Sequence, residues 1–117
     1  MADFNVNLRG VGSVSVIDVK GYLDAHTAPE LENVFNKLLD NQQFRVVVNF
    51  DELKYISSAG LGVFMAYVET MRENKGDIKF SNMKENVYNI FDLLGFPILY
   101  EFFKEEKEAL QKFDAQG

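Results

Sequence analysis

A buried strand that leads directly into a glycine-containing helix start is the feature that most restricts how this chain can fold. Residues 44–50 (FRVVVNF) are mostly β-branched or aromatic, which is typical of a central, buried strand. Residues 51–65 (DELKYISSAGLGVFM) then pass through a polar corner and begin an amphipathic helix at about Ser58. A strand joined to a helix in this way indicates an α/β fold.

The first turn of this helix carries the residues that most suggest a functional site. The hydroxyls of Ser57 and Ser58 can accept hydrogen bonds from backbone N–H groups that have no partner inside the helix. The same N–H groups and the helix dipole favour an anion, such as a phosphate on a serine. Gly60 and Gly62 each lower helix stability by about 1 kcal/mol relative to Ala, so we expect the sheet or a partner's backbone to approach them closely. A serine that only caps the helix remains the alternative interpretation.

The rest of the chain alternates predicted strands and helices. Residues 4–8 and 14–19 flank a glycine-containing turn and predict a β-hairpin, and a capping box from Thr27 to Glu30 predicts the start of a helix that ends near residue 41. The other expected elements are helices over residues 58–73, about 84–94 and 104–113, a strand over 78–81, and an edge strand or extended connector over 96–100. Their expected core-facing residues include Phe64 or Met65, and Leu94. We therefore expect one α/β domain over residues 1–117, with a mixed sheet that begins with a hairpin and about four helices.

Charge and composition exclude several classes of protein. Acidic residues outnumber basic ones by 18 to 12, and a net charge of −6 argues against nucleic acid as a partner. No apolar run approaches the roughly 20 residues that span a bilayer, and the first ten residues lack the pattern of a signal peptide. The chain has no cysteine, so a disulfide framework and a thiolate metal site are both excluded. The expected location is the cytoplasm.

Neither hydrolysis nor metal binding is predicted. A serine hydrolase needs a base beside its nucleophile, but the single histidine, His26, lies in a predicted loop and no G-x-S-x-G segment occurs. Asp24, Asp51 and Glu52 could converge near Ser58, but loop carboxylates are usually solvated. We expect no catalytic residue, no metal site and no cofactor.

Three motifs in order resemble those of the anti-sigma factor antagonists of the STAS domain family. They are the run DELKYISSAGLGVF at residues 51–64, the segment GYLDAHTA at 21–28, and IFDLLGF at 90–96. In that family the phosphorylated serine lies two residues before the first glycine of G-L-G, and the matching residue here is Ser58. Many members have aspartate immediately before that serine, where this chain has Ser57, so Ser57 is the alternative phosphorylation site.

The resemblance implies a non-catalytic switch. The unphosphorylated protein would bind an anti-sigma factor that is also a serine kinase and so release a sigma factor; phosphorylation would end this binding, and a serine phosphatase would restore it. The implied partner-binding residues are Asp24, Ser57, Ser58, Ala59, Gly60, Leu61 and Gly62. The alternative is a STAS interaction subunit of a stress-signalling or transport assembly that is never phosphorylated.

Aromatic residues are crowded near the end of the chain. Phe96, Tyr100, Phe102 and Phe103 are more than one small face buries easily. Two expectations follow: some of them form a contact surface, including a homodimer interface, or the last helix packs back on the sheet.

Overall fold

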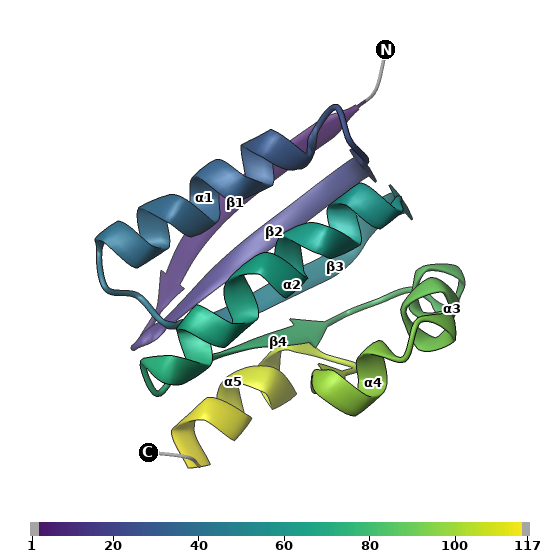
Figure 1. The fold of residues 1–117 in the computed structure, drawn as a ribbon. Helices are drawn as coiled ribbons and strands as arrows, with labels where there is room; N and C mark the ends of the chain where they lie inside the picture. Colours follow the sequence, from purple (N-terminus) through teal and green to yellow (C-terminus); the bar gives the residue numbers. More distant parts are fainter. Residues whose placement is uncertain (1–2, 116–117) are drawn as a thin grey trace.

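The predicted hairpin is confirmed, and both of its strands are longer than expected. The computed structural model describes residues 3–115, in which β1 pairs with β2 in antiparallel register, and β2, β3, β4 and β5 then pair in parallel. The strand order is β1-β2-β3-β4-β5 (Figure 1). The strands are β1 (Phe4–Val11), β2 (Val14–Leu23), β3 (Arg45–Ile56), β4 (Asp77–Ser81) and β5 (Phe102–Phe103). The expected α/β fold with a mixed sheet is therefore confirmed.

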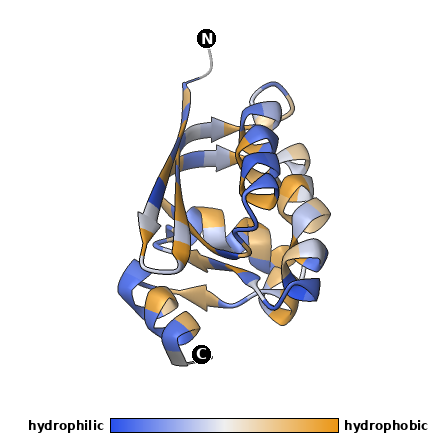
Figure 2. Cartoon of the chain, turned by 90° about the vertical axis from the view of Figure 1, so that its left-hand side faces the viewer, coloured by the Kyte–Doolittle hydropathy of each residue, from blue (hydrophilic) through white to orange (hydrophobic). Residues whose placement is uncertain are grey.

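The helices lie on both sides of this sheet. Within residues 3–115 they are α1 (Ala28–Asp40), α2 (Ser58–Glu73), α3 (Glu85–Leu93), α4 (Phe96–Leu99) and α5 (Glu106–Ala115). Helices α1 and α2 each connect two neighbouring parallel strands, and right-handed crossovers place both on the same face. Figure 2 views the sheet from its side and shows α5 across the sheet from α1 and α2.

The prediction of an extended segment over residues 96–100 is wrong. Gly95 ends the preceding helical segment with a φ of +78°, a conformation that glycine adopts without strain, and Phe96–Leu99 then form the short helix α4. Pro97 lies in the first turn of α4, where its missing N–H leaves no helical hydrogen bond unmade. This short helix explains why five helices are present where about four were expected.

The polar corner predicted after residue 50 is also wrong, because β3 continues to Ile56. Its last residues pair with the end of β2, where Leu23 is paired with Ile56. Glu52 lies on the sheet face opposite α1 and α2, in a part that α5 does not cover, and it forms an ion pair of 2.9 Å with Lys20 of β2. Glu52 lies four strand residues before Ile56, about 13 Å away, so it does not converge on Ser58.

The main core lies between the sheet and α1, α2 and α3. Its centre is a cluster of fully buried phenylalanines whose rings pack mostly edge to face, including Phe50 and Phe80 at 5.2 Å. The cluster consists of Phe35, Phe50, Phe64, Phe80 and Phe91. Of the two alternatives on α2, Phe64 is therefore the core residue, and Met65 is 56% exposed. The expectation that Leu94 is buried is wrong: it follows the last residue of α3 and is 59% exposed.

Helix α5 packs back on the opposite face, as one of the two expectations for the chain end proposed. Ala109 and Phe113 of α5 bury against valines of β2 and β3 in a second, smaller core. A polar cluster joins the start of α5 to the sheet. Arg9 Nε lies 2.7 Å from Asp18 Oδ2, and Arg9 Nη2 lies 2.6 Å from Glu106 Oε1. Hydrogen bonds from Arg9 lower the pKa of the Asp18 and Glu106 carboxyls below their usual values.

The two glycines of α2 have different surroundings. A Cβ atom at Gly60 would lie 2.7 Å from the Leu23 side chain and 3.1 Å from the Leu23 carbonyl oxygen. A Cβ atom at Gly62 would have no neighbour within 4 Å. The sheet therefore explains Gly60, as expected, but it does not explain Gly62.

This difference predicts opposite effects of two alanine substitutions on the free energy of unfolding. Gly60→Ala should lower it by roughly 1–3 kcal/mol, because the methyl group has to displace the end of β2. Gly62→Ala should raise it by up to about 1 kcal/mol, because alanine favours the helix and meets open space. Urea denaturation of both variants tests this; destabilisation by both would contradict the assignment of Gly62 to a free surface.

The Arg9 cluster predicts a stability contribution that disappears in acid. Glu106→Gln should lower the free energy of unfolding by about 1 kcal/mol at pH 7, since the ion pair is partly exposed. The folded-state pKa of Glu106 lies below its unfolded value near 4.3, so this contribution is present above about pH 5 and is lost as pH falls through the folded-state pKa. Denaturation at pH 7 and pH 3 measures the difference. Glu52→Gln, which removes the more exposed Lys20 pair, is the control and should change little at either pH.

Candidate functional site

The predicted site lies where the parallel strands β2 and β3 end together. Leu23 and Ile56 are paired, and the backbone N–H of Ser57 donates a 2.9 Å hydrogen bond to the Leu23 carbonyl oxygen. The loop that begins at Asp24 and the start of α2 at Ser58 therefore leave the same edge of the sheet from neighbouring strands (Figure 1). In α/β sheets, the carboxyl ends of parallel strands are where binding sites usually form.

Asp24 shapes the loop between β2 and α1. Its Oδ1 atom accepts hydrogen bonds from the backbone N–H groups of His26 at 2.9 Å and Thr27 at 3.1 Å. The predicted capping box is wrong, because the Thr27 hydroxyl donates to the Tyr22 carbonyl oxygen at 2.8 Å and makes no cap hydrogen bond to α1. Asp24 thus holds the loop in its folded shape, and Thr27 ties it to the end of β2, next to the start of α2.

The two serines at the start of α2 occupy different environments. Ser57 is the N-cap residue, but its hydroxyl makes no cap hydrogen bond and is buried without a partner among residues 3–115. Ser58 is the first residue of the helix and is exposed. The first helical hydrogen bond runs from Leu61 N–H to the Ser57 carbonyl oxygen, and neither serine supports the interpretation of a simple side-chain cap.

The following residues divide between a buried side and an exposed side of α2. Gly60 and Leu61 face the sheet, and Leu61 is 3% exposed. Ser58, Ala59 and Gly62 are exposed. Of the residues predicted to bind a partner, these three are accessible on α2, whereas Gly60 and Leu61 pack the helix on the sheet.

Two further groups belong to this region and were absent from the prediction. The Leu23 carbonyl oxygen anchors Ser57, and a backbone contact of this kind leaves no residue-type signal in a sequence. Met65 follows Ser58 by seven positions and Gly62 by three, so it lies on the same exposed side of α2. That spacing was visible in the sequence, but Met65 was grouped with Phe64 as a core alternative.

The surroundings of Ser58 hold no arrangement typical of a hydrolase or a metal site. His26 is exposed, and the hydrogen bonds of residues 3–115 do not join its imidazole to either serine. Across the same described residues, no three histidine or carboxylate side chains gather in a way that would hold a metal ion. The helices of this part of the chain are all too short or too polar to cross a bilayer.

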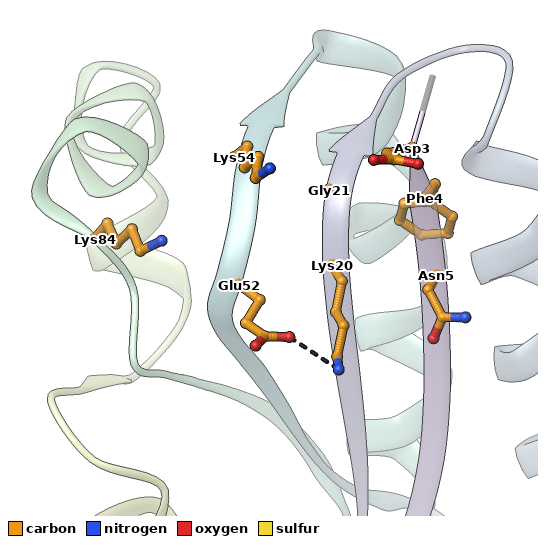
Figure 3. A pocket seen from close by; sticks show the side chains of 8 residues that line it. All are labelled: Asp3, Phe4, Asn5, Lys20, Gly21, Glu52, Lys54 and Lys84. Carbon is orange, nitrogen blue, oxygen red and sulfur yellow. Dashed lines mark ion pairs between the residues drawn. The ribbon is translucent and has the colours of Figure 1, made fainter. Parts of the chain in front are cut away.

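A pocket of about 520 Å³ lies elsewhere, on the sheet face opposite α1 and α2, where α5 does not cover it. Figure 3 shows its lining residues, with Lys20, Lys54 and Lys84 projecting from three different segments. The Lys20–Glu52 ion pair crosses one side of the pocket. None of the predicted site residues lines it, so it is separate from the Ser58 region.

Curated proteins and solved structures resemble this chain over most of its length. The anti-sigma-B factor antagonist of Staphylococcus epidermidis is 29% identical over 93 residues, which cover 78% of this chain and 86% of that protein. An anti-sigma factor antagonist from Mycobacterium paratuberculosis superposes with a TM-score of 0.86 at 20% identity, covering 94% of this chain and 93% of the other.

The anti-sigma factor antagonist SpoIIAA in its unphosphorylated form superposes with a TM-score of 0.82 at 19% identity, covering 95% of this chain and 97% of that one. A structure of SpoIIAA from Bacillus in the phosphorylated form also superposes, with a TM-score of 0.72 at 18% identity over 95% of this chain and 99% of the other. These structural likenesses show that the fold is shared. A sequence model of the STAS domain matches residues 5–109, and this chain therefore belongs to the STAS domain family.

Proposed function

We propose that this protein is an anti-sigma factor antagonist whose partner binding is switched off by phosphorylation of Ser58. In the unphosphorylated state it binds an anti-sigma factor with serine kinase activity through the exposed start of α2 and the Asp24 loop. Binding releases a sigma factor, the kinase then transfers phosphate to Ser58, and a serine phosphatase removes it. The protein itself has no catalytic role in this cycle.

The observation that carries the proposal is that Ser58 is exposed at the start of α2. The close contact between Gly60 and Leu23 fixes this helix start to the sheet. A kinase needs an accessible hydroxyl, and Ser58 is exposed whereas the Ser57 hydroxyl is buried. This contrast favours Ser58 over Ser57 as the phosphate acceptor. The names of the relatives support the antagonist role, and the phosphorylated form of SpoIIAA supports a phosphate in a protein of this fold.

Phosphate at Ser58 is compatible with the folded state. It adds about −1.5 to −2 charges at the positive end of α2, where the helix dipole contributes roughly 0.3–1 kcal/mol of stabilisation. The described part of the chain places no side chain over Ser58, which is solvent exposed. The modification therefore acts on what binds this surface rather than on the fold.

Phosphate at Ser58 is incompatible with a docked partner. A partner that covers Ser58 would have to remove water from the new charge, next to the half-buried carboxylate of Asp24. Gly62 instead favours docking of the unphosphorylated protein, because its lack of a side chain allows a partner's backbone to approach α2 closely. Desolvation and like-charge repulsion together separate the complex.

Substitutions at Ser58 test the switch directly. Ser58→Asp should weaken binding of the purified cognate anti-sigma factor by at least about tenfold, because it places a charge in the interface. Ser58→Ala should bind like the parent protein but accept no phosphate from the kinase and ATP. Calorimetry measures the binding, and intact mass with phosphosite mapping measures the transfer.

Ser57→Ala is the matched control and should still take up one phosphate. Phosphate found on Ser57 would keep the switch but move its site. If Ser58→Asp binds as tightly as the parent, and the protein from its native host stays unmodified in growth and stress, the permanent interaction subunit replaces the switch.

A further inference from the structure

Large apolar side chains are exposed where α3 ends and α4 follows. Leu93 is 85% exposed and Ile98 is 88% exposed, with Leu94 and Leu99 at 59% and 55%. Met65, at 56%, lies across from Leu99 on α2, and both residues line one groove. Isolated exposed apolar residues are ordinary, but apolar side chains that line one groove together, as Met65 and Leu99 do, mark a contact surface.

The groove between α2 and α4 has a volume of about 510 Å³ and largely apolar walls. Met65 and Val68 form the α2 wall, and Leu99 and Tyr100 form the opposite wall. A tyrosine is uncharged at neutral pH, and burial, which raises the pKa of Tyr100 to about 12, keeps this wall uncharged.

Arg72 fixes the two walls relative to each other. Its guanidinium group donates hydrogen bonds to the Leu99 carbonyl oxygen and, at 2.8 Å, to Asp77 Oδ1, and it lies 5.6 Å from the centre of the Tyr100 ring. The groove is therefore built before anything binds, and a ligand would not have to order it.

The charge that remains free on this groove is negative. The positive charge of Arg72 is matched by the Asp77 carboxylate, whereas Glu69 and Glu73 line the groove and form no ion pair within the described chain. A second copy of this chain would bring the same acidic residues together, and an anionic lipid surface would be repelled. Apolar walls with an acidic rim complement an apolar segment that carries lysine or arginine at its sides.

We propose that the α2–α4 groove binds a basic amphipathic helix of a partner protein, at a site independent of Ser58. The groove begins on α2 at Met65, seven residues and about 10 Å beyond Ser58, and its acidic residue Glu69 lies about 16 Å beyond Ser58. Ser58 does not line the groove, and a phosphate on it would not contact the groove walls, so the contact would persist when the Ser58 surface is released. The proposal stands on the groove alone and does not require that Ser58 be phosphorylated.

Nuclear magnetic resonance titration of the full chain tests the proposal with three synthetic peptides. The first is a helical peptide of about 14 residues, long enough to span about 21 Å, with leucines at positions i, i+3, i+4 and i+7 and lysines beside them. The second has glutamate in place of each lysine, and the third is a scrambled version of the first. The basic amphipathic peptide should shift the methyl signals of Met65, Val68 and Leu99 and bind at least about tenfold more tightly than the other two.

Variants of the chain separate the groove from general attraction to an acidic protein. Glu69→Lys combined with Glu73→Lys, and separately Leu99→Ser, should each weaken binding of the basic peptide by at least about tenfold. Leu8→Ser, which removes an exposed leucine on β1, and Ser58→Asp should leave it unchanged.

Three results would overturn the proposal. The first is equal binding of the scrambled peptide, which would mean charge attraction alone. The second is a set of shifted signals away from the groove. The third is a concentration-dependent dimer of the free chain in sedimentation that Leu99→Ser abolishes, which would assign the groove to a second copy.

Discussion

The junction of β2, β3 and α2 is the constraint on which the rest of the structure depends. Ser57 is tied to Leu23 by a backbone hydrogen bond of 2.9 Å, and Gly60 lies so close to Leu23 that no other side chain fits without displacement. These two contacts fix where α2 begins and how it crosses the sheet. They also bring the Asp24 loop beside the first turn of α2, so the fold and the candidate site share one set of interactions.

The two faces of the sheet are stabilised by different kinds of interaction. The face under α1, α2 and α3 holds a large aromatic core, in which shape and close packing dominate. The opposite face has a small apolar cluster under α5 and a network of charges around Arg9. Much of the part of this face that α5 leaves uncovered carries polar side chains and is exposed. The end of β3 therefore resembles a loop in composition.

Local signals predicted the central elements of the fold, and prediction failed where one local pattern suited two structures. The FRVVVNF strand, the start of α2 near Ser58 and the closeness of Gly60 to the sheet all follow from hydrophobic pattern and glycine placement. The prediction for residues 96–100 failed because apolar composition with one proline suits both a strand and a short helix. Gly95, in the left-handed αL conformation, selected the helix.

The candidate site was predicted to a similar extent. The resemblance to the STAS family grouped Asp24 with Ser58, and the described structure has both where β2 and β3 end. The burial of the Ser57 hydroxyl and the role of the Thr27 hydroxyl depend on how the two loops pack. Neighbouring serines look equivalent in a sequence, and only tertiary packing distinguishes them.

The fit of Gly60 against Leu23 has a consequence for any pair of enzymes that act on Ser58 in opposite directions. Because contacts at Ser57 and at Gly60 hold the first turn of α2 against Leu23, adding or removing a phosphate would change its charge while its backbone shape stays the same. A kinase and a phosphatase would then meet one common surface, and would have to tell the two forms apart by the phosphate group itself.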